Sequence, residues 1–97
     1  MKARNIIGPK VRRLRHQRGW SQNDLAIKLQ LLGMEEATRG KVSKIEARLV
    51  WVSDEDLLYL ASALGVGLEE LYPSILHHTK GLYEAIQAVK GSRYGVS

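Results

Sequence analysis

The sequence has 97 residues, of which 44% are apolar, and a net charge of +5, which suits one compact domain with a modest core. It contains no cysteine, which excludes a disulfide framework and a zinc site of the cysteine type. No apolar run reaches the length of a membrane span, and together these features favour a cytoplasmic location.

The charge is unevenly distributed along the chain. Residues 1–18 contain no acid, and their basic residues are Lys2, Arg4, Lys10, Arg12, Arg13, Arg15 and Arg18. Residues 39–48 are also basic, with Glu46 as their only acid, whereas residues 49–79 contain no lysine or arginine. This pattern indicates either a polyanionic partner on the basic side or a charged face that meets only solvent, and charge alone leaves both readings open.

Start and stop signals predict five helices. A helix begins at a proline or at a serine or threonine cap, often with an acid three residues after the cap, and it ends at a glycine. In chain order the signals are Gly8-Pro9, Gly19, Ser21 with Asp24, Gly33, Thr38, Ser53 with Asp56, Gly65, Gly67 and Pro73. They delimit helices at about 9–18, 22–31, 39–47, 54–64 and 68–72, with apolar residues at helical spacing. The sequence therefore predicts an all-α fold.

The last part of the chain is a separate question. We divide the protein into a domain over 1–73 and a C-terminal extension over 74–97, whose final residues look like a loose end. Within the extension, 80–90 is a candidate helix that Gly91 ends. Its apolar stripe consists of Leu82, Ile86 and Val89. That stripe is either core or a surface for a partner, and the sequence leaves both open.

The second and third helices narrow the interpretation. Gln22 stands at the start of the second helix, and the third helix turns Val42 and Ile45 inward. The residues left on the outer side of the third helix are Arg39, Gly40, Lys41 and Lys44.

With its flanking segments, this pair resembles the lambda-repressor-like helix-turn-helix family (Cro-type and XRE regulators), which includes phage repressors and many bacterial regulators. The matching segments are 11–15 with Gly19, 21–22 with 24–26, 42–46, and 60–66 with 68–71. The match covers about residues 6–72. It implies a compact bundle of five helices, a dimer on a near-palindromic operator, and the third helix in the major groove.

The resemblance also implies which residues contact DNA. Gln22 would contact a phosphate or a base and brace the third helix, and Arg39 would form a bidentate pair of hydrogen bonds with guanine. The residues facing the groove would be Thr38, Arg39, Gly40, Lys41 and Lys44. The residues adding backbone contacts, which give affinity without sequence choice, would be Lys10, Arg12 and Arg13. Each of these residues could instead be an ordinary solvated surface residue without a DNA contact. For residues such as Arg12 and Arg13 this alternative is the commoner one.

An ion pair between the first and third helices is a further expectation. In the family an arginine of the first helix pairs with the glutamate that ends the Ile-Glu step. Because Ile45 points inward, Glu46 beside it is shielded, and a shielded carboxylate needs a partner. We therefore predict a salt bridge between Arg15 and Glu46.

The chain departs from the family pattern in two places. The link between Leu29 and Val42 is longer than the usual tight turn, which leaves the angle of the third helix open. After Glu46, where the family often has Asn-Gly, the chain has Ala47-Arg48 and then the apolar run 49–52. Four apolar residues cannot all face inward in an extended segment, so we expect at least one to stay exposed and serve a dimer contact.

The sequence thus predicts a sequence-specific double-stranded DNA-binding regulator of transcription, a repressor, that acts as a homodimer. We expect no enzymatic activity, no cofactor and no metal. The alternative is an antitoxin of a toxin–antitoxin pair, which would bind its own operator and use 74–97 to mask a toxin protein. A protein-interaction module that has lost DNA binding is a third possibility, and the basic outer side of the third helix argues against it.

Overall fold

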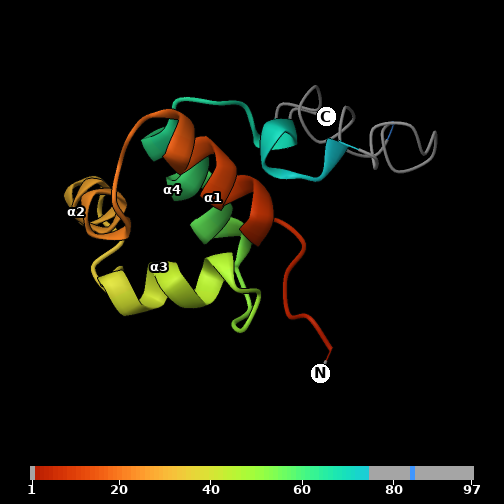
Figure 1. Ribbon diagram of the computed structural model, residues 1–97, viewed down its shortest axis with the longest axis horizontal. Helices are drawn as coiled ribbons and strands as arrows, with labels where there is room; N and C mark the ends of the chain where they lie inside the picture. Colours follow the sequence, from red (N-terminus) through yellow and green to blue (C-terminus); the bar gives the residue numbers. More distant parts are fainter. Residues whose placement is uncertain (1, 75–83, 85–97) are drawn as a thin grey trace, which may run out of the picture.

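The computed structural model describes residues 2–74 and residue 84, and four α-helices make up most of the described part. They are α1 (Gly8–Gln17), α2 (Gln22–Leu32), α3 (Arg39–Glu46) and α4 (Asp54–Leu64), and a 3-10 helix η1 (Leu68–Leu71) follows them (Figure 1). None of the described residues lies in a strand. The candidate helix at 80–90 lies outside the described residues except for Glu84, which is exposed.

The expectation of five helices was wrong in its last element. The segment expected to form a fifth helix at 68–72 is a single 3-10 turn of four residues. Its backbone bonds span three residues, from Glu70 N to Gly67 O at 3.0 Å and from Tyr72 N to Glu69 O at 3.3 Å. The proline at position 73 follows directly, so too few residues remain for the four-residue repeat of an α-helix.

Three of the four α-helices begin at side-chain caps that the sequence predicts. Ser21 and Asp24 bond each other's backbone N–H at 3.0 and 2.8 Å, and Ser53 with Asp56 repeats this capping box at the start of α4. The bond from the Ser21 backbone N–H lowers the pKa of Asp24. Thr38 Oγ1 accepts from Lys41 N at 3.1 Å at the start of α3. These caps confirm the predicted starts of α2, α3 and α4, and α1 begins at the predicted Gly8-Pro9 without a side-chain cap.

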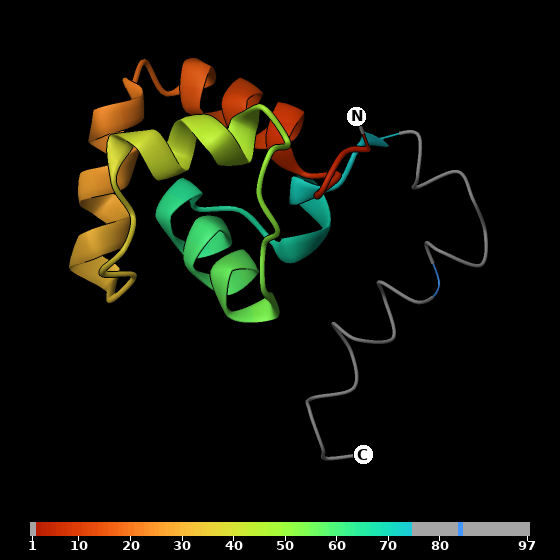
Figure 2. The ribbon, with the colours of Figure 1, turned by 90° about the horizontal axis from the view of Figure 1, so that it is seen from below.

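The core lies between the helices, and every described element contributes to it (Figure 2). The buried apolar residues are Ile7, Val11, Leu14, Leu25, Ala26, Leu29, Met34, Ala37, Val42, Ile45, Leu60, Ala61, Leu64 and Leu71. The buried charged residues in the described part of the chain are Arg15 and Glu46. α3 is thus held by apolar contacts along one side and by a charged pair near its C-terminal end.

The segment before α1 is fastened to the end of α3. Asn5 Nδ2 donates to Ile45 O and Val50 O, at 3.2 and 2.9 Å. Gly8 packs so closely that an added Cβ would lie 2.3 Å from Ile45 O. Arg48 has φ +65°, in the left-handed region that residues other than glycine rarely adopt, and its Nε donates to Asn5 O at 2.9 Å. These contacts fix α1 relative to α3.

Candidate nucleic-acid interface

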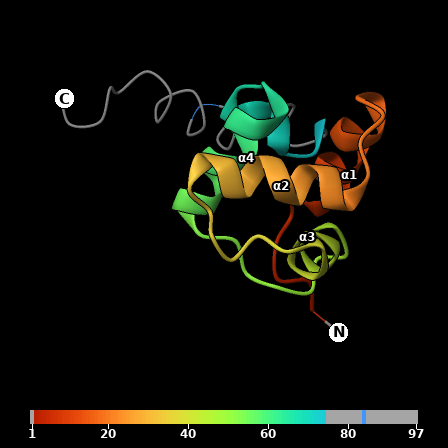
Figure 3. The same ribbon diagram turned by 90° about the vertical axis from the view of Figure 1, so that its left-hand side faces the viewer.

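The link between α2 and α3 packs onto the core despite its length. Met34 and Ala37 are fully buried, and Met34 N donates to Leu29 O at 3.0 Å. Gln30 Nε2 also donates to Ala37 O at 2.6 Å, which ties the end of the link back to α2. Figure 3 shows α2 along its length and α3 nearly end-on, so the two helices cross. The longer link therefore still gives a crossed helix pair, held in place by apolar contacts.

The outer side of α3 is polar and accessible. Val42, Ile45 and Glu46 are buried, whereas Lys41 is half-buried. The exposed residues of the helix are Arg39, Gly40, Ser43 and Lys44. Ser43 was not among the candidates from the sequence. It follows Arg39 by four residues, so helical spacing alone would have placed it on the same side.

The predicted ion pair joins α1 to α3. Arg15 Nε lies 2.6 Å from Glu46 Oε2, and Arg15 Nη2 donates to Glu46 Oε1 at 3.0 Å, so the pair is bidentate. The third guanidinium nitrogen, Nη1, donates to Trp20 O at 2.7 Å. The bond to Glu46 raises the pKa of Arg15, which keeps the guanidinium charged, and the prediction is confirmed.

Gln22 belongs to the same network. Its Nε2 donates to Glu46 Oε1 at 3.1 Å, which connects the first residue of α2 with the last residue of α3. Gln22 therefore touches the end of α3, and the geometry fits the bracing role that the resemblance implies. Around this contact lies a shallow depression that we call the polar hollow. It is lined by Arg12, Arg15, Gln22, Ser43, Glu46 and Ala47.

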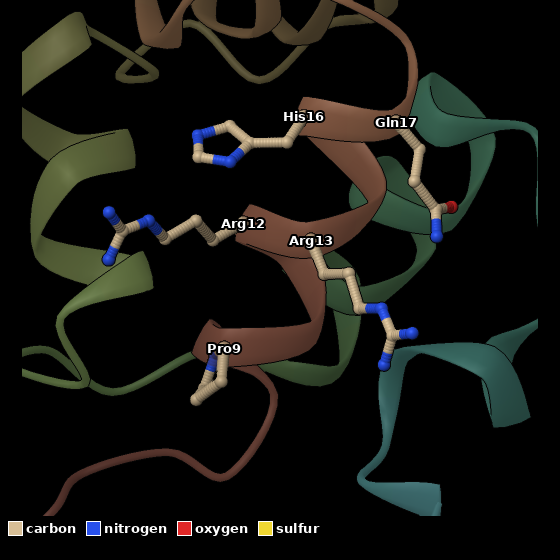
Figure 4. A pocket seen from close by; sticks show the side chains of 5 residues that line it. All are labelled: Pro9, Arg12, Arg13, His16 and Gln17. Atoms are coloured by element: carbon tan, nitrogen blue, oxygen red, sulfur yellow. The ribbon is translucent and has the colours of Figure 1, made fainter.

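The basic residues expected to contact the DNA backbone do not share one side of α1. Arg12 lines the polar hollow with residues of α2 and α3. In Figure 4 the side chains of Arg12 and His16 point to one side of α1, and those of Arg13 and Gln17 point to the other. Lys10 is half-buried, and its Nζ lies 3.5 Å from Ser74 Oγ. The structure thus brings Arg12 together with Gln22 and α3, whereas Arg13 and Lys10 do not line the polar hollow.

Thr38 occupies the remaining predicted position, directly before α3. Its side chain is exposed, and its hydroxyl already accepts a hydrogen bond from the backbone of α3. The hydroxyl therefore has a structural task of its own as the N-cap.

In the described part of the chain, no group of three or more histidine, cysteine, aspartate or glutamate residues is placed to hold a metal ion. Nor do the described residues contain a helix long and apolar enough to cross a membrane.

Comparisons with known proteins bear on the whole region. Residues 6–72 match the family described as a helix-turn-helix domain. No curated protein and no solved structure matches the chain. The matched range includes all four α-helices and η1, and it covers more than half of the sequence. Domains of this kind bind DNA and are typically not enzymes. The chain therefore belongs to the helix-turn-helix domain family, which is consistent with the Cro and XRE type that its motifs resemble.

Proposed function

We propose that this protein binds double-stranded DNA at a specific sequence and represses transcription, with α3 in the major groove. The observation that carries this proposal is the arrangement around α3. Its outer side is exposed and basic, its inner side is buried, and Arg15, Glu46 and Gln22 hold its end. The major groove is wide enough for an α-helix, and a rigidly held helix presents its side chains to base edges in a fixed register.

Arg39 is the proposed reader of a base edge. It is exposed at the start of α3, where recognition helices make most of their base contacts. Its guanidinium can donate two parallel hydrogen bonds to O6 and N7 of guanine. Lys44 and Ser43, four or five residues further along the exposed side, extend the same contact surface.

Gly40 supports a close approach of α3 to DNA. A Cβ added there would find its nearest neighbour, Thr38 Oγ1, at 3.8 Å, which is an ordinary contact. The packing of the protein therefore does not require glycine at this position, although glycine stabilises a helix less than alanine does. A position without a side chain lets the helix backbone lie close to the groove, and this would offset the loss in helix stability.

A homodimer is the second part of the proposal. Trp51 is 69% exposed and Leu49 is 44% exposed, as expected for the apolar run 49–52. Large exposed apolar side chains so near each other favour a protein contact. Sedimentation equilibrium tests this: the Trp51→Ser variant should associate more weakly than the wild type. Equal association of a folded variant would contradict the dimer contact.

Selection of bound sites from random duplex DNA tests the proposed function directly. We expect a preferred, near-palindromic site, bound more tightly than a scrambled duplex of the same length and composition. Both duplexes should be titrated at several salt concentrations, because phosphate contacts alone also give affinity. A wild-type protein that prefers no duplex would contradict its assignment as a specific regulator.

A further inference from the structure

His16 contacts the hydrogen-bond network of Arg15, Glu46 and Gln22, and this contact depends on the charge of the imidazole. Its Nε2 lies 3.1 Å from Arg15 Nη2. A guanidinium has donors and no acceptor, so the imidazole must accept at Nε2 and carry its proton on Nδ1. The contact therefore exists only while His16 is neutral.

The hydrogen bonds around Glu46 connect His16 and Arg15 of α1 with Gln22, the first residue of α2. Arg15 Nη2 bonds both His16 Nε2 and Glu46 Oε1, and Gln22 Nε2 donates to the same Glu46 oxygen. The Glu46 carboxylate thus accepts hydrogen bonds from both Arg15 and Gln22. His16 accepts a further hydrogen bond from Arg15. His16 therefore contacts Arg15, the residue that bonds the last residue of α3.

His16 is exposed and lies among cations. Its ring points to the same side of α1 as Arg12, the side that faces the polar hollow, and the depression beside it is lined by Pro9, Arg12, Arg13, His16 and Gln17 (Figure 4). The charged groups around it are Arg12 and Arg15 of its own helix, with Glu46 of α3 on the far side of Arg15, whereas Arg13 lines the same depression from the other side of α1. No side chain of α4 or η1 lines this depression.

Free and DNA-bound protein should therefore favour different charge states of His16. In the free protein a proton on Nε2 would break the bond to Arg15 and add another cation beside Arg12 and Arg15. DNA phosphates near Arg12 would neutralise those cations and offer acceptors to the imidazolium. Histidine is the side chain whose charge ordinarily changes between about pH 5 and 8.

We propose that His16 is a DNA phosphate contact that takes up a proton when DNA binds, exchanging its bond to Arg15 for one to phosphate. This rests on the proposed function. Because the bound state holds more protons than the free state, affinity must rise as the pH falls, by at most about tenfold per pH unit for one proton. The contact reads no base, so preferred and scrambled duplexes gain alike.

Binding titrations of the full chain between pH 5.5 and 8 test the proposal. We expect wild-type binding to be about three- to tenfold tighter at pH 6 than at pH 8, on both duplexes. His16→Gln should remove most of this difference, because glutamine does not titrate in that range. The chain's other histidines provide the matched control: the variant with His77→Gln and His78→Gln should keep the wild-type dependence.

The possible results distinguish a failure of the proposed role of His16 from a failure of the proposed DNA binding. If the protein binds a preferred duplex and His16→Gln has the same pH dependence as the wild type, the role of His16 is refuted and DNA binding stands. If no duplex is bound at any pH, the proposed function fails and this inference fails with it. Long-range nitrogen NMR spectra of the free protein check the premise without DNA. The neutral ring should carry its proton on Nδ1, and a ring protonated on Nε2 alone would overturn the proposal.

Discussion

The two sides of this molecule use charge in opposite ways. At the start of α4, the acids Asp54 and Asp56 lie at the positive end of the helix dipole, and Asp56 completes a capping box. On α1 and α3, Arg12, Arg39 and Lys44 take part in no ion pair within the described residues, where Arg15–Glu46 is the one pair present. Acids on the first side therefore stabilise the fold, whereas cations on the second remain available to a partner.

The largest expected effect comes from breaking the Arg15–Glu46 ion pair that joins α1 to α3. Arg15→Ala leaves Glu46 buried without its cation, and loss of one partner of a buried pair costs about 3–5 kcal/mol in the free energy of unfolding. Urea denaturation measures this. The matched control is Arg13→Ala, which removes an exposed arginine two positions away and should change stability by less than about 0.5 kcal/mol. Equal stability of the two variants would show that the pair does not hold α3.

The second effect concerns the preference for particular DNA base pairs, which we assign to Arg39. Arg39→Ala should weaken binding to the preferred duplex by about 1–3 kcal/mol and relax the choice at one base pair. Glu55→Ala on the acidic side should cause no loss of binding. Titrations against a panel of single-base variants measure both quantities. If Arg39→Ala weakens preferred and scrambled duplexes equally, Arg39 contacts a phosphate and reads no base.

The sequence predicted those features that depend on neighbouring residues. Ser21 and Ser53 start helices because each side chain bonds a backbone N–H three residues on, and such a bond needs no knowledge of the fold. The Arg15–Glu46 pair was also predicted, because a shielded carboxylate beside Ile45 and the family resemblance pointed to the same partner. Exposure within 49–52 followed from the alternation of side chains in an extended segment.

What the sequence missed depends on how the helices cross. Arg12 and Arg13 are adjacent in the chain, and only the position of α1 against α3 shows that Arg12 alone lines the polar hollow. The bond between His16 and Arg15 likewise depends on the orientation that Glu46 imposes on the guanidinium. The fifth helix was overestimated because its start and stop signals, Gly67 and Pro73, enclose a segment too short for the four-residue repeat of an α-helix.

The two capping boxes offer a matched test of both sides. Ser21→Ala and Ser53→Ala each remove the same hydrogen bond to a backbone N–H, and each should lower the free energy of unfolding by about 1 kcal/mol. Only Ser21→Ala should also weaken DNA binding, because Gln22 follows it directly and bonds Glu46. Denaturation curves and binding titrations on the same samples give the comparison. Equal binding losses in both variants would indicate a general loss of folded protein.

The smallest expected effect separates two adjacent arginines. Arg12 lines the polar hollow next to Gln22 and Ser43, whereas the Arg13 side chain points to the other side of α1 (Figure 4). Each phosphate contact contributes about one unit to the slope of log affinity against log salt. Arg12→Ala should therefore flatten that slope by about one unit on preferred and scrambled duplexes alike, and Arg13→Ala should leave it nearly unchanged. Both variants lose the same charge, so a difference in slope reports position and not net charge. Equal slopes for the two variants would mean that the DNA covers both sides of α1, and the interface would then extend beyond the polar hollow.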